Sequence, residues 1–205
     1  MRKLICLILS TLFVFCLFGC SLGLKNENEK VISDVKEMEK NEHKLLTFEI
    51  TYDKYKKATD KMLADYYKNK EDQIIFVDEG KVYKGKDLAG VSQEKMTELK
   101  KKLEKSTGIV LEDIKEDRVE ISQVYDDDTF NYKHIFVKET QKLGEFQEVV
   151  IYKKYWFKKI DDAWKIGNIN QLCFSIGKLP KEEKDKYEKY DGKDIKYVEN
   201  LDFQK

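Results

Sequence analysis

The chain has 205 residues, of which 41% are hydrophobic and 38% are charged, with a single proline. This length fits one domain with short extensions, and the composition excludes collagen-like and proline-rich low-complexity sequence. Because 39 Lys and Arg residues balance 39 Asp and Glu residues, the chain lacks the basic excess of a dedicated nucleic-acid-binding protein. We therefore expect no nucleic acid among its partners.

The first twenty residues have the layout of an export signal. Arg2 and Lys3 precede an apolar run of 15 residues, Leu4 to Phe18, which is shorter than the ~20 residues of a membrane-spanning helix. The run ends in Leu-Phe-Gly-Cys at residues 17–20, which resembles the lipobox of bacterial lipoproteins. The resemblance implies a signal peptide over residues 1–19 and lipidation of Cys20. An ordinary secretory signal, or an uncleaved anchor in which Cys20 is incidental, is the alternative.

A lipidated Cys20 would hold the protein on the extracytoplasmic face of the cell membrane. Two acyl chains, at ~0.8 kcal/mol per buried CH₂, give stable attachment. Residues 20–29 would then form the lipidated cysteine and a polar tether. Cys6 and Cys16 would leave with the signal, so Cys173 would have no cysteine partner for a disulfide. The apolar residues around Cys173 predict a buried, unreactive thiol.

Helical patterns come first along the mature chain. Apolar residues recur at helical spacing in three segments, which are residues 29–44, 52–69 and 92–107. Ser92 fits an N-cap, and Gly108 fits a left-handed C-cap. Between the second and third segments, residues 72–77 predict a strand. His43 lies near the end of the first segment, where we expect it to be solvated.

After Gly108 the apolar period changes to two residues, which predicts strands. The predicted strands cover residues 119–125, 131–141, 145–160 and 164–176. Short turns separate them, so we expect an antiparallel meander. We assign residues 30–178 to one domain and residues 179–205 to a charged C-terminal extension.

The order of these elements resembles the nuclear transport factor two-like superfamily, also called SnoaL-like or cystatin-like. Two pieces carry the resemblance: YKKYWFKKIDDAWKIGNI at residues 152–169 and FVDEGKVYKGKDLAG at residues 76–90. It implies an α+β fold in which N-terminal helices pack on a curved, cone-like antiparallel sheet of about four to five strands. The superfamily includes isomerases, dehydratases and non-enzymatic binding modules, so the fold alone does not give the function.

Both faces of the strand at residues 145–160 are apolar, although a sheet with one solvated face should alternate apolar and polar residues. Four residues form a candidate interaction face for a protein partner or a homodimer: Tyr152, Tyr155, Trp156 and Phe157. The C-terminal extension could instead pack over the second face. A bulge at Lys153–Lys154 would explain the pattern without any additional contact.

Candidate catalytic groups are few. His134 is a weak candidate for a proton donor, since it would need a partner carboxylate and an open pocket; a packed, hydrogen-bonded histidine is the alternative. The run Asp126-Asp127-Asp128 fits a turn better than a cation site, because it lacks the glycine and the terminal glutamate of a calcium loop. Trp164 is expected to be largely buried against the N-terminal helices.

We therefore expect a membrane-anchored extracytoplasmic lipoprotein that acts as a binding or interaction module, with the membrane as one partner. We expect no cofactor and no metal, since the two histidines and the cysteines lack metal-ligand spacing. The alternative is an isomerase- or dehydratase-like enzyme that uses the cone-shaped pocket for a small substrate.

Overall fold

The computed structural model describes residues 26–68, 74–108, 110, 114–143, 147–175 and 181–203. The predicted signal peptide and Cys20 lie outside the described residues, and so does the side chain of Cys173. Within those ranges, no helix combines the length and the apolar character that a membrane span requires.

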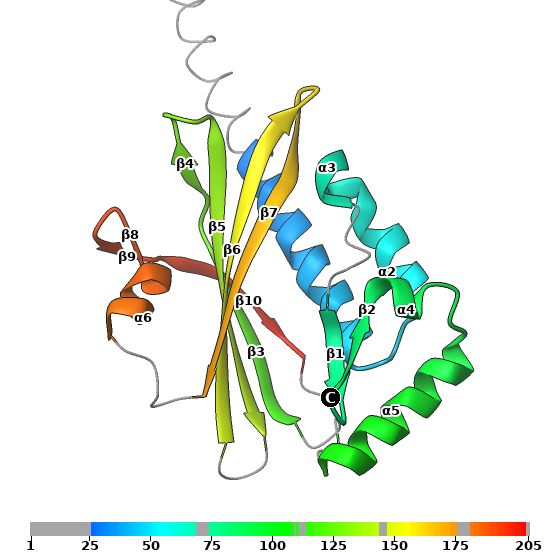
Figure 1. The fold of residues 1–205 in the computed structure, drawn as a ribbon. Helices are drawn as coiled ribbons and strands as arrows, with labels where there is room; N and C mark the ends of the chain where they lie inside the picture. Colours follow the sequence, from blue (N-terminus) through cyan, green and yellow to red (C-terminus); the bar gives the residue numbers. More distant parts are fainter. Residues whose placement is uncertain are drawn as a thin grey trace, which may run out of the picture.

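Residues 26–46 are helical, in agreement with the helix predicted over residues 29–44. The helix buries the apolar positions expected from its periodicity, which are Val31, Val35 and Met38. We refer to this element as the 26–46 helix. It runs along one face of the sheet in Figure 1.

The prediction of one continuous helix over residues 52–69 is wrong, because the segment is divided into shorter elements. The segment consists of α2 (Tyr52–Thr59), a 3-10 turn η1 (Asp60–Met62) and α3 (Asp65–Lys68). Leu63 has extended backbone angles and forms a parallel bridge to Ile166 of the sheet. The amide of Ala64 also donates to the carbonyl of Ile166, at 2.9 Å. A tertiary backbone contact therefore replaces helical hydrogen bonds that the local pattern favours.

A hairpin and two helices follow, and they form a second small core. The hairpin contains β1 (Ile74–Asp78) and β2 (Lys81–Lys84); α4 (Gly85–Leu88) and α5 (Gln93–Thr107) come next. The Ser92 hydroxyl caps α5, and Gly108 ends it with φ of 68°, so both predicted caps are confirmed. Buried residues of this core include Leu45, Phe48, Tyr52, Tyr83, Leu88 and Met96.

The main sheet is antiparallel and contains six strands, so the α+β prediction is confirmed. Its strands are β3 (Ile114–Ser122), β4 (Tyr125–Asp127), β5 (Tyr132–Leu143), β6 (Gln147–Ile160), β7 (Ala163–Ser175) and β10 (Tyr197–Asp202). The order is β10-β3-β5-β6-β7, and β4 pairs with β5. The C-terminal segment thus supplies an edge strand of the same sheet.

The pairing of β5 with β6 is continuous from Tyr132–Lys158 to Leu143–Gln147, so the suggested bulge at Lys153–Lys154 is wrong. The irregularity lies instead on β7, where Gly167 is the extra residue opposite Trp156 and Phe157. A Cβ at Gly167 would lie 2.3 Å from the hydroxyl oxygen of Tyr66, which explains why glycine occupies this bulge.

Without a bulge, the side chains of β6 alternate regularly between the two faces of the sheet. The inner face points to the 26–46 helix and α2, and we call the space between them the cone. Tyr155 and Phe157 belong to this inner face and are fully buried in the main core. Tyr152 and Trp156 belong to the opposite, outer face.

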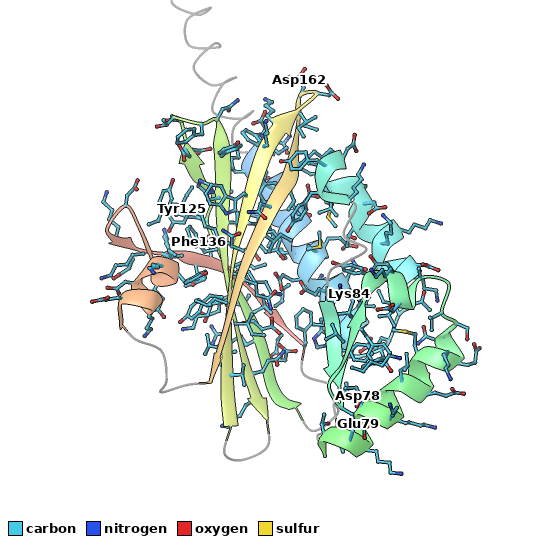
Figure 2. The ribbon with its side chains drawn as sticks, viewed as in Figure 1. Asp78, Glu79, Lys84, Tyr125, Phe136 and Asp162 are labelled. Carbon is cyan, nitrogen blue, oxygen red and sulfur yellow. The ribbon has the colours of Figure 1, made fainter. Side chains whose placement is uncertain are left out.

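The C-terminal segment covers the outer face. It contains α6 (Lys181–Glu188), β8 (Lys189–Tyr190) and β9 (Lys193–Asp194), which lie across the sheet from the helices (Figure 1). The Tyr187 ring lies 5.8 Å from that of Tyr152, and the Tyr190 ring lies 4.9 Å from that of Tyr125. Figure 2 shows Tyr125 and Phe136 on this side of the sheet.

The predicted interaction face therefore does not form one exposed surface. Tyr155 and Phe157 are 0% exposed in the core, and Tyr152 is 3% exposed beneath the C-terminal segment. The alternative, in which the chain's own extension covers the second face, is the arrangement that this structure contains. A partner could reach Tyr152 only if that segment moved.

Trp164 contacts the N-terminal helix as predicted, but it is partly rather than largely buried. Its indole Nε1 donates to Oε2 of Glu27 at 2.8 Å. The ammonium groups of Lys133 and Lys159 lie 4.9 Å and 5.8 Å from the ring centroid. The side chain therefore joins the first turns of the 26–46 helix to the end of the sheet.

Candidate functional site

His134 lies on the outer face of β5, and not in the cone where a catalytic role was considered. It is 1% exposed, and its ring packs edge-on against Trp156 with centroids 4.4 Å apart. Burial lowers the pKa of His134, and Lys154 lowers it further. Asp127, at 3.6 Å, acts in the opposite direction and raises it. A packed histidine that burial keeps neutral fits the packing expected in the non-catalytic alternative, although its Nδ1 has no hydrogen-bond partner among the described residues.

The aspartate run forms a turn, as predicted. Asp127 accepts hydrogen bonds from the amides of Thr129 and Phe130, at 3.1 and 3.3 Å. Asp126 pairs with Lys133 at 2.5 Å. In the part of the chain that the structure describes, no group of three or more His, Cys, Asp or Glu side chains could hold a metal ion.

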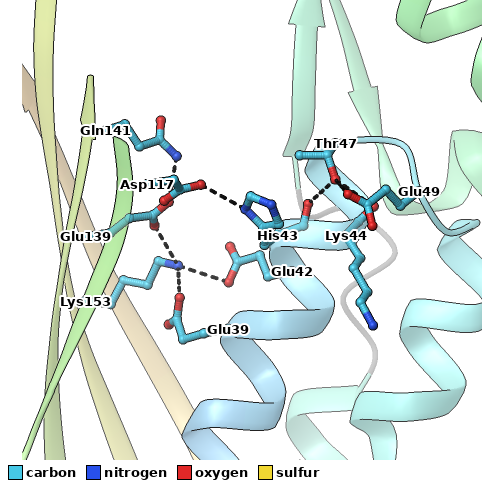
Figure 3. A network of polar contacts seen from close by, with 10 residues as sticks. All are labelled: Glu39, Glu42, His43, Lys44, Thr47, Glu49, Asp117, Glu139, Gln141 and Lys153. Atoms are coloured by element: carbon cyan, nitrogen blue, oxygen red, sulfur yellow. Dashed lines mark hydrogen bonds and ion pairs between the residues drawn. The ribbon is translucent and has the colours of Figure 1, made fainter. Parts of the chain in front are cut away.

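The polar site that the fold does assemble lies inside the cone, around Lys153 (Figure 3). Lys153 is on the inner face of β6 and is 3% exposed. Its Nζ lies 2.7 Å from Glu39, 3.2 Å from Glu42 and 3.5 Å from Glu139. The hydroxyl of Tyr155 donates to the second oxygen of Glu39 at 2.5 Å. A buried ammonium is thus surrounded by three carboxyl groups from two elements.

Helical spacing brings the polar groups of the 26–46 helix together. Glu39, Glu42 and His43 are three and four residues apart, so they share one face of the helix. This face continues the one that buries Val35 and Met38 in the preceding turns. The inward face of the 26–46 helix is therefore apolar in its earlier turns, where it fills the cone, and charged near its C-terminal end.

Burial and mutual attraction act in opposite directions on these groups. Burial raises the pKa of Glu139 to about 7, since it outweighs the attraction of Lys153. Burial also raises the pKa of Glu39. Burial alone would lower the pKa of Lys153, but its three carboxyl neighbours outweigh that effect and raise the pKa well above the ordinary value. Lys153 therefore stays charged at neutral pH, while Glu139 exchanges its proton near pH 7.

Asp117, on β3, faces the same site and is 3% exposed. Its Oδ2 lies 2.9 Å from Nδ1 of His43, but neither carboxylate oxygen accepts a hydrogen bond from any described residue. The His43 ring stacks on Phe203, with centroids 4.1 Å apart and an angle of 12°. The expectation that His43 is solvated is wrong, because Phe203, which follows β10, stacks on its ring.

A pocket of about 180 Å³ opens among these groups. Four carboxyl groups, one lysine and one histidine line it, together with apolar and neutral side chains: Glu39, Glu42, Asp117, Glu139, Lys153, His43, Leu46, Thr47, Gln141, Ile151 and Phe203. On the other side of Glu42 lies a smaller pocket of about 70 Å³, with Tyr55 and Tyr67 in its wall. The larger pocket exceeds the ~150 Å³ that accommodates a benzene molecule in an apolar cavity.

This site was not among the sites predicted from the sequence. Lys153 was considered only as the position of a bulge, although it stands between Ile151 and Tyr155 on an apolar face. Glu39 and Glu42 lie in the helix predicted over residues 29–44, but no role was predicted for them. Two signals of this site were available in the sequence. One is a charged residue at an inward position on a strand, and the other is carboxylates in register with an apolar helix face.

The chain matches no protein-family model, no curated protein and no solved structure. The relationship to the nuclear transport factor two-like superfamily and the lipobox therefore stay predictions from the sequence.

Proposed function

We propose that this protein is a membrane-tethered binding module, anchored on the extracytoplasmic face through an acylated Cys20, that binds a small ligand in the pocket around Lys153. The signal-like N-terminus and the residues at 17–20 support the anchor. The observation that supports binding is the pocket itself, which places buried, charged groups at one end of an otherwise apolar cone. Burying such groups is costly unless they are paired or serve a ligand.

Three small aliphatic probes of different charge test the binding function: ethylammonium, 1-propanol and propionate. We expect at least one of them to raise the melting temperature of the full-length protein in detergent. The same probe should have no effect on Gln141→Trp, because the indole would occupy the pocket. Asn170→Trp, at an exposed position of β7, is the matched control and should respond like wild type. If no probe stabilises the wild-type protein, the pocket does not bind small ligands.

One observation favours an enzyme as the second candidate: Nδ1 of His43 lies 2.9 Å from Asp117 in the pocket. A carboxylate beside a histidine is an arrangement that supports proton transfer. An isomerase-like enzyme should exchange α-protons of small ketones with deuterated water, and His43→Gln should abolish the exchange. If wild type and His43→Gln give the same exchange rate by NMR, this candidate is excluded.

A further inference from the structure

We infer that the pocket around Lys153 takes a small organic cation, of the primary alkylammonium class, which pairs with Asp117 and the neighbouring carboxylates. This inference rests on the proposed binding function and assigns the chemical class of its ligand. It follows from the charge, the unsatisfied groups and the size of the pocket.

The charges in the pocket do not balance. Lys153 is its single lysine, and it faces carboxyl groups from three elements: Glu39 and Glu42 on the 26–46 helix, Asp117 on β3 and Glu139 on β5. Glu39 accepts hydrogen bonds from both Lys153 and Tyr155. The four carboxyl groups outnumber the lysine and the histidine that line the pocket with them. A ligand with a positive charge would offset part of this excess.

Asp117 shows where that charge is needed. The side chain is 4% exposed and lines the pocket, so bulk water does little to stabilise its charge. Its Oδ1 has no partner among the described residues, and Oδ2 has only the imidazole of His43 nearby. A buried carboxylate oxygen without a hydrogen-bond partner is costly, so a donor that reaches Oδ1 from the pocket gains free energy. An ammonium group, with three N–H donors, fits this requirement.

The size and the walls of the pocket select a small ligand with a short hydrocarbon part. Its volume of about 180 Å³ is below the ~300 Å³ of ordinary drug-sized sites. Leu46, Ile151 and Phe203 supply apolar wall beside the carboxylates. A metal ion fits less well, since no described group of ligands is arranged to hold one. A short alkylammonium ion matches both the charged and the apolar parts.

The test uses the full-length protein in detergent with ethylammonium chloride as the probe. An ion of three heavy atoms has an upper limit of affinity near a Kd of ~1 mM. At about twenty times the Kd, we expect the melting temperature to rise by about 4–7 °C. Equal concentrations of sodium chloride and of 1-propanol should leave it unchanged.

Variants locate the site. Asp117→Asn should remove the ethylammonium effect, and it should not unfold the chain, because the amide keeps the shape of the side chain and removes a buried charge whose Oδ1 has no partner among the described residues. Glu42→Gln should weaken the effect and provides an independent second variant. Glu29→Gln changes an exposed carboxylate on the same helix and should respond like wild type. A full ethylammonium response in Asp117→Asn would overturn the inference.

The outcomes separate this inference from the function on which it rests. If 1-propanol or propionate stabilises wild type but not Gln141→Trp, and ethylammonium has no effect, the pocket binds ligands of another class. In that case the inference fails and the proposed function stands. If none of the three probes has an effect, both fail.

Discussion

Lys153 is the residue on which the polar site depends. A buried ammonium is tolerated here because carboxyl groups of Glu39, Glu42 and Glu139 lie within 3.5 Å of it. Removing one partner of a buried ion pair leaves the opposite charge buried without a partner. The free-energy cost of that unpaired charge is larger than the free energy that the intact pair contributes to stability. The stability of the polar site therefore depends on this lysine.

Lys153→Met should lower the free energy of unfolding by about 3–5 kcal/mol, because it leaves three carboxyl groups without their cation. Denaturant unfolding measures the change. Lys158→Met, at an exposed position of the same strand, should stay within about 0.5 kcal/mol of wild type. Adding Glu39→Gln to Lys153→Met should recover part of the loss. A Lys153→Met protein as stable as wild type would show that these contacts contribute little.

Glu139 should make stability depend on pH near neutrality. Its pKa is raised to about 7 in the folded chain, so the folded state binds more protons than the unfolded state between about pH 4.5 and 7. This contribution is full below pH 4.5 and is lost as the pH rises through 7. Between pH 5.5 and 7.5 it should amount to about 1–2 kcal/mol.

The comparison that isolates this effect is wild type against Glu139→Gln, measured by denaturant unfolding at both pH values. His134 acts in the opposite direction, because burial lowers its pKa, and both proteins contain it. Wild type should therefore lose more stability than Glu139→Gln on going from pH 5.5 to 7.5. Equal losses in the two proteins would mean that Glu139 has an ordinary pKa in the folded chain.

At the scale of elements, local patterns predicted most helices and strands, and tertiary contacts decided the rest. The caps of α5 depend only on residues at the ends of the helix, so the sequence predicts them directly. The break at Leu63 depends on a bridge to Ile166, about a hundred residues away, so no local pattern contains it. The edge position of β10 likewise depends on pairing with β3.

The candidate site was less predictable than the fold for the same reason. His43 looks solvated within its helix, and only the return of Phe203 encloses it. Asp117 and Glu139 lie on neighbouring strands, but their proximity to Glu39 depends on how the helix crosses the sheet. In contrast, the sequence shows that both faces of β6 are apolar, and this pattern correctly predicted that the outer face is covered.

Deletion of residues 181–205 should expose the outer face of the sheet, since this segment packs on Tyr152, Tyr125 and Phe136. We expect increased fluorescence of a hydrophobic dye and self-association in sizing experiments. The deletion also removes β10, which leaves β3 as an unpaired edge.

The double variant Tyr187→Ser, Tyr190→Ser separates these two effects, because it keeps β10 and removes only the aromatic contacts. It should still increase dye binding. Val198→Ser, at a position 45% exposed on β10, is the control and should behave like wild type. A truncated protein that remains monomeric and binds no additional dye would show that the segment does not cover an apolar surface.

At the scale of the whole molecule, one sheet has both faces occupied by its own chain: helices and the pocket on the inner side, and the C-terminal segment on the outer side (Figure 1). The charged pocket lies on the inner side of the sheet, where residues of the 26–46 helix and the strands line it together. A lipid anchor ahead of the 26–46 helix would hold this domain beside the membrane.

Cys20→Ser tests the anchor. The variant should shift from the membrane fraction to the unprocessed precursor or the medium, and it should no longer incorporate labelled palmitate. Cys16→Ser, within the predicted signal, is the control and should leave the mature protein in the membrane fraction. Palmitate incorporation that persists in Cys20→Ser would contradict lipidation at this position.

The central claim is that a cation binds against the carboxylates of the pocket, and the pH dependence of ethylammonium affinity tests it most directly. Ionised Glu139 should favour the cation, and so should ionised Glu39, while protonated His43 and charged Lys153 oppose it. With a pKa of about 7 for Glu139, the affinity should fall by up to about tenfold between pH 8 and pH 6. An affinity that is unchanged or higher at pH 6 would contradict the account.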